Sequence, residues 1–422
     1  KGTRVGDARG KLWFFTTSRN LVLENGCLYD RFVDPVVDVS PPSVVFEWPY
    51  LYGGRPKGQR CRKNHRYIGL SIYDASFWNL LSHRLFGRQN FEIHKREVLY
   101  SAIREFSKSV NLNTHNLIKD TQNQIALFYN MLLYFRKLFS HYTPKALIFV
   151  DAYSGFNMAV VQAAKEMGIP TAELQHGFIY SHHPGYSKAV NGNSDCIPDY
   201  FLAFGNKFAE IVKKGNLFDP NGIFTVGYPY LDKIRKTTPC VHDAVEQFIR
   251  RYSHTVLVTS QWSISEEMKS FFFEVSKILR GDDVGIIYKP HPNDWHDHAE
   301  MSTRDNILLV DKSESIYELL KVVDVHTTAY STSGLEALYF GVPNVLVNIG
   351  FNKSIVSELG IIDGKSSFIA NTPEEYVSIL NKVVGNIEEY SRNARRKSLE
   401  FFEPEPQTKI KNFLRILDIW NA

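Results

Sequence analysis

The sequence has little of what marks several common protein classes. Its four cysteines contain no Cys-x-x-Cys pair and no close pair, so we expect four reduced thiols in a cytoplasmic protein. No apolar run approaches the ~18 residues that a transmembrane helix needs. The sequence contains no Asp-x-Asp, internal repeat or low-complexity segment. These absences argue against a metal-dependent site, a repeat protein and a membrane-spanning protein. The cysteines are Cys27, Cys61, Cys196 and Cys240.

The composition is that of an ordinary globular protein with a mild basic bias. Of the 422 residues, 44% are hydrophobic and 22% are charged, and the net charge is +4. This length predicts two domains that each bury a core. The basic bias suits an anionic ligand, and without a nucleic-acid-binding signature we expect no nucleic acid partner. Because the first residue is Lys1 and not Met, we expect the chain to be one module of a longer enzyme.

Strands alternate with helices in two successive blocks. The first block begins at ALIFVD, residues 146–151, and the second begins at TVLVTSQ, residues 255–261. Such alternation predicts parallel sheets covered by helices on both faces. We therefore expect an α/β protein with two Rossmann-like domains that face each other across a cleft. The expected domains are residues 1–235 with a Rossmann-like core from about 146, residues 236–400, and a C-terminal helix within 401–422 that crosses back to the first domain.

The second block carries polar residues at the ends of its strands, where parallel sheets bind ligands. The expected strand VGIIYKPHP, residues 284–292, ends in Lys289, Pro290, His291 and Pro292. A hydroxyl-rich turn then leads into a helix near residue 333, and a helix N-terminus attracts phosphate. An ordinary helix N-cap needs only one hydroxyl, whereas this turn has several, which favours a phosphate-binding site over a simple cap. The predicted donor-binding residues are Ser260, Gln261, Lys289, His291, Pro292, Ser331, Thr332, Ser333, Gly334 and Glu336, with Glu336 expected at ribose hydroxyls.

The first block places a carboxylate and an imidazole at neighbouring strand ends. Asp151 ends one strand, and Gln175, His176 and Gly177 end the next. A carboxylate beside an imidazole suits a general base or a nucleophile with a proton shuttle. Glu173 lies on the same strand as His176 and is a third catalytic candidate. A helix cap remains the alternative for Asp151.

Three further residues are candidates for contacting an acceptor. Gln175 precedes His176 at the same strand end, and Arg60 and Arg62 belong to the basic stretch Arg55–Arg66. Such a stretch is by default a solvated loop, and its functional alternative is a dock for an anionic glycan or a membrane surface. His182 and His183 lack companions at metal-ligand spacing, so we predict no metal site and no cofactor.

These motifs resemble the donor half of GT-B glycosyltransferases that build bacterial surface polysaccharides. KPHP followed by S-T-S-G-x-E-A-x-x-x-G-V-P is similar to segments of capsule-synthesis Kdo transferases, polysialyltransferases and CDP-glycerol polymerases. The resemblance covers roughly residues 146–350. It implies that His291-Pro292 and Ser331–Ser333 hold the donor phosphates, that His176-Gly177 supplies a base, and that Asp151 is the acidic residue of the first domain.

The resemblance implies a nucleotide-sugar-dependent glycosyltransferase. We expect transfer of an acidic sugar, as from CMP-Kdo, to a growing capsule or lipopolysaccharide glycan or glycolipid. The expected location is the cytoplasm, with peripheral contact at the inner membrane or with other polysaccharide synthesis proteins as a further expectation. A UDP-sugar 2-epimerase is one alternative, because His291-Pro292-Asn293 fits its strand end, although its Arg-Pro-Glu segment is absent. A non-catalytic glycan-binding module of a synthesis complex is the other alternative.

Overall fold

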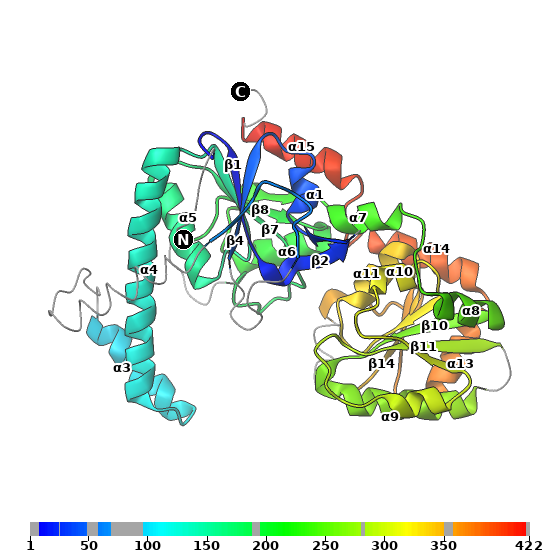
Figure 1. The fold of residues 1–422 in the computed structure, drawn as a ribbon. Coiled ribbons are helices and arrows are strands. Elements are labelled where there is room, and N and C mark those ends of the chain that lie inside the picture. Colours follow the sequence, from blue (N-terminus) through cyan, green and yellow to red (C-terminus); the bar gives the residue numbers. More distant parts are fainter. Residues whose placement is uncertain are drawn as a thin grey trace.

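The protein contains two parallel sheets, each with helices on both faces (Figure 1). A computed structural model describes residues 8–24, 26–48, 58–68, 96–187, 195–279, 283–349 and 358–418. The two α/β units confirm the predicted GT-B-like fold class.

The first sheet has seven parallel strands in the order β5-β4-β1-β6-β7-β8-β9. Its strands β6 and β7 are buried along their whole length, as sheets covered on both faces require. β1 pairs with β6 through the register Trp13 to Leu147, so the sheet draws on residues far before 146. The strands are β1 (Leu12–Thr17), β4 (Ser43–Trp48), β5 (His65–Tyr67), β6 (Ala146–Val150), β7 (Thr171–Leu174), β8 (Tyr200–Ala203) and β9 (Ile223–Thr225).

Helices cover both faces of this sheet. On one face, Phe135 and Phe139 of the long helix α4 pack against Trp13 and Phe15. On the other face, α6 and the C-terminal helix α15 complete the core. The helices of this half are α1 (Asp34–Val37), α3 (Arg96–Ser109), α4 (Thr114–Tyr142), α5 (Gly155–Glu166), α6 (Asn206–Gly215), α7 (Pro229–Arg235) and α15 (Pro406–Ile416).

The second sheet has six parallel strands in the order β12-β11-β10-β13-β14-β15. Helices α9 and α13 pack on one face, and α8, α10 and α11 on the other. The strands are β10 (His254–Thr259), β11 (Val284–Lys289), β12 (Ile307–Leu309), β13 (Val325–Thr327), β14 (Asn344–Val347) and β15 (Ser367–Ala370). The helices are α8 (Asp243–Arg251), α9 (Ser265–Ile278), α10 (Ile316–Leu320), α11 (Ser333–Phe340), α13 (Pro373–Val384) and α14 (Ile387–Ser398).

The chain passes between the two halves twice. It leaves the first sheet through α7 and returns after α14, so that α15 lies beside the first sheet (Figure 1). Phe413 of α15 packs against Tyr200 and Phe224. The returning segment runs so close to the first sheet that a Cβ atom at Gly205 would lie 2.4 Å from the Phe401 carbonyl carbon. Glycine is therefore required there.

A small antiparallel hairpin stands beside the first sheet at the cleft. It consists of β2 (Leu21–Glu24) and β3 (Cys27–Asp30). Cys27 is joined to Cys61 by a disulfide across a Cα–Cα distance of 5.1 Å, whereas Cys196 and Cys240 are not disulfide-bonded. The prediction of four reduced thiols is therefore wrong for this pair. The separation of 34 residues carries no characteristic spacing, and only the fold brings the two cysteines together.

The described helices are all too short or too polar to span a bilayer.

Candidate functional site

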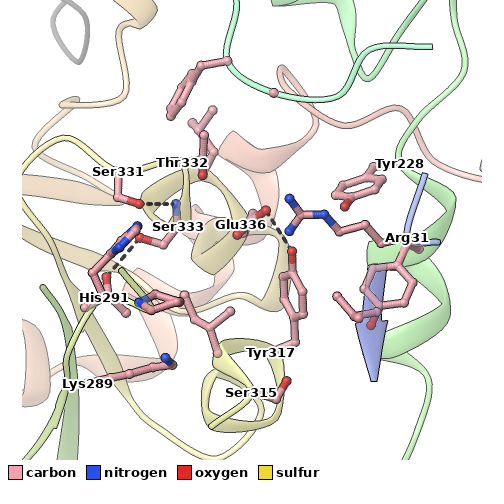
Figure 2. Close-up of a pocket in the computed structure, with 18 of the residues that line it drawn as sticks. Arg31, Tyr228, Lys289, His291, Ser315, Tyr317, Ser331, Thr332, Ser333 and Glu336 are labelled. Carbon is pink, nitrogen blue, oxygen red and sulfur yellow. Dashed lines mark hydrogen bonds between the residues drawn. The ribbon is translucent and has the colours of Figure 1, made fainter. Parts of the chain in front are cut away.

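A cavity of about 700 Å³ lies between the two halves, at the carboxyl ends of strands from both sheets. One wall comes from the loops after β1, β3 and β7, and the other from the loops after β10, β11, β12 and β13. This is the crevice in which open parallel sheets bind ligands. Figure 2 shows the second-half wall together with Arg31 and Tyr228, which reach it from the first half.

The turn between β13 and α11 is held by the end of β10. The Gln261 side-chain oxygen accepts hydrogen bonds from the Tyr330 backbone N–H at 3.0 Å and the Thr328 hydroxyl at 3.5 Å. The hydroxyl oxygens of Ser333 and Thr259 lie 3.0 Å apart. Ser331, Thr332 and Ser333 thereby line the cleft at the start of α11, where the helix dipole favours an anion.

Lys289 and His291 bring donor groups to the same wall. The His291 Nδ1 atom accepts a hydrogen bond from the Asn293 backbone N–H at 3.1 Å, so the neutral imidazole carries its proton on Nε2. Burial, followed by the charge of Lys289, lowers the pKa of His291. Burial lowers the pKa of Lys289 to about 8, and its ammonium donates to the Lys312 carbonyl at 2.8 Å. At neutral pH the site thus offers a largely charged ammonium and a neutral imidazole N–H donor.

Glu336 lies on the first turn of α11 and faces the cleft. Its carboxylate accepts a hydrogen bond from the Tyr317 hydroxyl at 3.1 Å, and the Arg31 guanidinium approaches it from the first half (Figure 2). Burial raises the pKa of Glu336, and Arg31 and Tyr317 oppose that shift. The contact of Glu336 with ribose hydroxyls stays a prediction.

His176 is the sequence-predicted catalytic residue that lines the cleft from the first half. Its Nε2 atom lies 3.2 Å from the Tyr153 hydroxyl, and its Nδ1 atom has no hydrogen-bond partner among the described residues. Burial, followed by Arg19 and His183, lowers its pKa to about 4. His176 is therefore neutral at pH 7 and able to accept a proton.

The two predicted carboxylates lie behind this wall and do not line the cleft. Asp151 follows β6 with a φ of 70°, and its Oδ1 atom is buried without a hydrogen-bond partner among the described residues. Burial raises the pKa of Asp151 to about 6 and that of Glu173 to about 8. The Glu173 carboxylate accepts from the Tyr186 hydroxyl at 2.9 Å. The hydrogen-bond partner of His176 is Tyr153, two residues after Asp151.

The predicted acceptor residues are engaged elsewhere. The Gln175 amide donates to the Gly177 carbonyl at 2.8 Å and accepts from the Phe204 N–H at 2.7 Å. Arg60 forms a bidentate pair with Glu47, with distances of 2.8 and 2.6 Å. Arg62 pairs with Asp34 and Asp38. Of the basic stretch, residues 55–57 lie outside the described residues.

Of the ten predicted donor-binding residues, eight line the cleft and two support it from behind or beside it. The lining residues are Ser260, Lys289, His291, Pro292, Ser331, Thr332, Ser333 and Glu336. Gln261 holds the turn, and Gly334 lies within α11 near the side chains of Ile361 and Asn344. Asn344 in turn donates to the Gly334 carbonyl at 2.9 Å.

Sequence analysis missed three residues of the site: Arg19, Arg31 and Tyr153. Arg19 belongs to the short turn Ser18–Asn20 after β1, and Arg31 directly follows β3. The sequence signal for Arg19 is its position just after the apolar run of β1, and nothing local in the sequence shows that this run pairs with residues 146–150. In the part of the chain that the structure describes, no group of three or more His, Cys, Asp or Glu side chains is arranged to hold a metal ion.

The chain matches a protein-family model over part of its length. Residues 161–345 match the model of the family described as CDP-Glycerol:Poly(glycerophosphate) glycerophosphotransferase, which is less than half of the chain. The matched segment contains His176, His291 and the turn at Ser331–Ser333. The match supports a domain related to a family of nucleotide-dependent transferases, and it does not identify a sugar as the transferred group. No match was found among curated proteins.

Solved structures with the same fold span nearly the whole chain. A putative UDP-N-acetylglucosamine 2-epimerase from Listeria monocytogenes has a TM-score of 0.59 at 12% identity, with 94% of each chain covered. The S. aureus MnaA-UDP co-structure has a TM-score of 0.57 at 11% identity, with 98% of each chain covered. A glycosyltransferase from Rickettsia africae has a TM-score of 0.52 at 12% identity, covering 98% of this chain and 99% of that one. At these identities the likeness shows the GT-B-like fold alone.

Proposed function

We propose that this protein transfers a group from a nucleotide donor held by the second half to an acceptor hydroxyl that is deprotonated by His176. The observation that carries the proposal is that His291 and the Ser331–Ser333 turn face the same cleft as His176. One wall suits the phosphates of a leaving nucleotide. The other presents a neutral imidazole, which is the form a general base requires.

The chemistry follows from the two walls. His176 takes the proton of the acceptor hydroxyl while the hydroxyl oxygen attacks the transferred group. The bond to the nucleotide phosphate breaks, and the departing phosphate keeps the electron pair. Lys289, the Nε2–H of His291 and the N-terminus of α11 stabilise the charge on that phosphate. In this route no metal ion is needed at the phosphate.

A retaining route through Asp151 is the alternative. There the Asp151 carboxylate attacks first and the acceptor displaces it. Asp151 does not line the cleft, and Tyr153 takes the hydrogen-bonding place beside His176 that the sequence suggested for Asp151. We therefore favour His176 as base, with direct displacement and inversion.

For the donor we favour a cytidine nucleotide. The support is the family model for residues 161–345, whose description names CDP-glycerol, and the resemblance to capsule enzymes. We propose CMP-Kdo or a related acidic sugar as the donor, with a glycan or glycolipid of the bacterial surface as the acceptor. Glycerol phosphate from CDP-glycerol is the second candidate, because the family description names that reaction.

Thermal shift tests the nucleotide. A ligand that binds only the folded state raises its stability, by about 2.7 kcal/mol at a hundred times Kd. We expect CMP and CDP to raise Tm more than UDP or GDP, and a shift with UDP alone would exclude the cytidine donor. Incubation with labelled CMP-Kdo, CDP-glycerol and UDP-N-acetylglucosamine then separates transfer from other activities. Conversion of the UDP-sugar to its 2-epimer would indicate an epimerase, and binding without turnover a glycan-binding module.

A further inference from the structure

The two walls of the cleft differ in charge. On the second-half wall, Lys289 and Lys312 are accompanied by Glu314 and Glu336. The first-half wall carries Arg19 and Arg31, and no carboxylate from the described part of that half lines the cleft. The nucleotide phosphates have their own donors on the second-half wall. The arginines therefore form a separate excess of positive charge.

Neither arginine is held in an ion pair with another described residue. The described carboxylates form no ion pair with the Arg19 or Arg31 side chain, in contrast to Arg60 and Arg62 near by in the sequence. Arg19 is exposed to the cleft. The Arg31 Nε atom is buried and has no hydrogen-bond partner among the described residues. A buried guanidinium N–H without a partner is costly, and an anionic oxygen would satisfy it.

Glu336 does not supply the missing hydrogen-bond acceptor for the Arg31 Nε–H. The Arg31 guanidinium points toward it across the cleft, but the hydrogen bond that Glu336 receives comes from Tyr317 (Figure 2). The aromatic rings of Tyr228 and Phe32 flank Arg31, with the guanidinium carbon 4.9 Å from the Phe32 centroid. These rings fix the direction of the side chain and contribute no negative charge at neutral pH.

Both arginines lie near the proposed base. Arg19 and Arg31 each act electrostatically on His176, and Phe32, which follows Arg31, touches the imidazole edge with the ring centroids 6.3 Å apart. An anion held by the arginines would therefore lie next to the reacting bond, on the first-half side of the nucleotide phosphate.

We propose that Arg19 and Arg31 form an anion subsite that holds a carboxylate or phosphoryl group of the transferred moiety beside His176. This inference rests on the proposed function and narrows its substrate class. A neutral hexose would offer no anionic oxygen to either guanidinium group. An acidic sugar offers its carboxylate, and a glycerol phosphate donor offers the phosphoryl group that is itself transferred.

Arg19→Met and Arg31→Met test the subsite, because methionine keeps an apolar stem and removes the charge. Calorimetry measures Kd for CMP, CDP, CMP-Kdo and CDP-glycerol on the full chain. Each variant removes a hydrogen bond to a charged group and is therefore expected to raise the Kd for the ligand that the subsite holds roughly 10-fold or more. Arg392→Met, on the exposed face of α14, is the matched control and is expected to leave every Kd unchanged.

The ligands separate the two sources of the anion. If the variants weaken the affinity for CMP-Kdo alone, and the Kd values for CMP and CDP are unchanged, the subsite binds a carboxylate. If they weaken the affinity for CDP and CDP-glycerol, and the Kd for CMP is unchanged, the subsite binds a phosphoryl group. Equal weakening of CMP, or no weakening of any ligand, would overturn the subsite.

Two controls separate folding and nucleotide binding from the subsite. If wild-type protein binds none of the four cytidine ligands, both the proposed donor and the subsite that would hold part of it are refuted, whereas loss of the subsite alone leaves CMP binding intact. Arg31→Lys, which keeps the charge but not the planar fork, is expected to recover part of the affinity. Such a recovery shows that the loss of affinity in Arg31→Met comes from the missing charge and not from misfolding. Because Arg19 is exposed, Arg19→Met is expected to fold normally, so a loss of affinity in that variant also reflects the missing charge.

Discussion

His176 is the residue on which the proposed chemistry depends most. Its pKa falls from 6.5 to about 4, chiefly through burial, with Arg19 and His183 adding to the shift. At 1.36 kcal/mol per unit, the folded protein favours the neutral imidazole by roughly 3 kcal/mol. The base is therefore ready at pH 7 and loses its function only in strongly acidic solution.

We expect His176→Gln to reduce kcat/KM for transfer by ~10²-fold or more while leaving the Kd for CMP unchanged. In the wild type, kcat/KM is expected to fall in acid with a midpoint near pH 4, because this parameter reports the free enzyme. A carboxylate route through Asp151 would instead place the midpoint near 6, the pKa to which burial raises that group. Initial rates with labelled donor from about one pH unit below the expected midpoint up to neutral pH measure the midpoint, and circular dichroism at each pH verifies that the protein stays folded.

The matched control is His182→Gln, an exposed imidazole six residues further along, which is expected to transfer at the wild-type rate. Full activity in His176→Gln would refute the assignment of the base. A midpoint near 6 together with an inactive Asp151→Asn would move the chemistry to the carboxylate, and the product would then retain its anomeric configuration.

Three further predictions concern the donor, metal ions and stability. His291→Ala and Ser331→Ala should each raise the Kd for CMP roughly 10-fold, since each removes a hydrogen bond to a charged group; calorimetry that finds wild-type affinity in both would place the phosphates elsewhere. Transfer should survive EDTA, because Lys289, His291 and the N-terminus of α11 meet the phosphate charge; loss in EDTA that added manganese restores would contradict this account. Burial raises the pKa of Glu173 from 4.5 to about 8, so its neutral form is favoured on folding and wild-type stability declines as pH rises from about 4.5 to 8. Glu173→Gln should remove that decline, so its stability relative to wild type should increase from pH 5 to pH 8 by on the order of 3–5 kcal/mol in urea unfolding; a constant difference would show that Glu173 is ionised in the folded protein.

The second half was largely predictable from sequence because its information is local. The strand 284–289 and the turn at Ser331–Ser333 each carry their polar residues directly at a strand end, and parallel topology brings strand ends together. His176 was predictable for the same reason.

The first half was less predictable because its pairings are distant in sequence. β1 pairs with β6 across more than 120 residues, so Arg19 after β1 gave no sign that it faces His176. Arg31 follows a small hairpin outside the main sheet, a place that strand alternation does not reveal. Arg60 and Arg62 illustrate the opposite error, because a basic stretch in sequence can be neutralised by acidic residues, here Glu47, Asp34 and Asp38, that only the fold brings near.

The return of the chain to the first half has a consequence for the order of folding during synthesis. Phe401, Ile410 and Phe413 belong to the same core as Phe201 and Phe208, although the entire second half is synthesised between them. A ribosome makes about 5–20 residues per second, so some 200 residues of delay correspond to roughly 10–40 s. During that interval β8 and β9 lack the helix that covers them. A nascent first half is therefore a species with an uncovered apolar face, and it becomes complete only when residues 401–417 have left the ribosome.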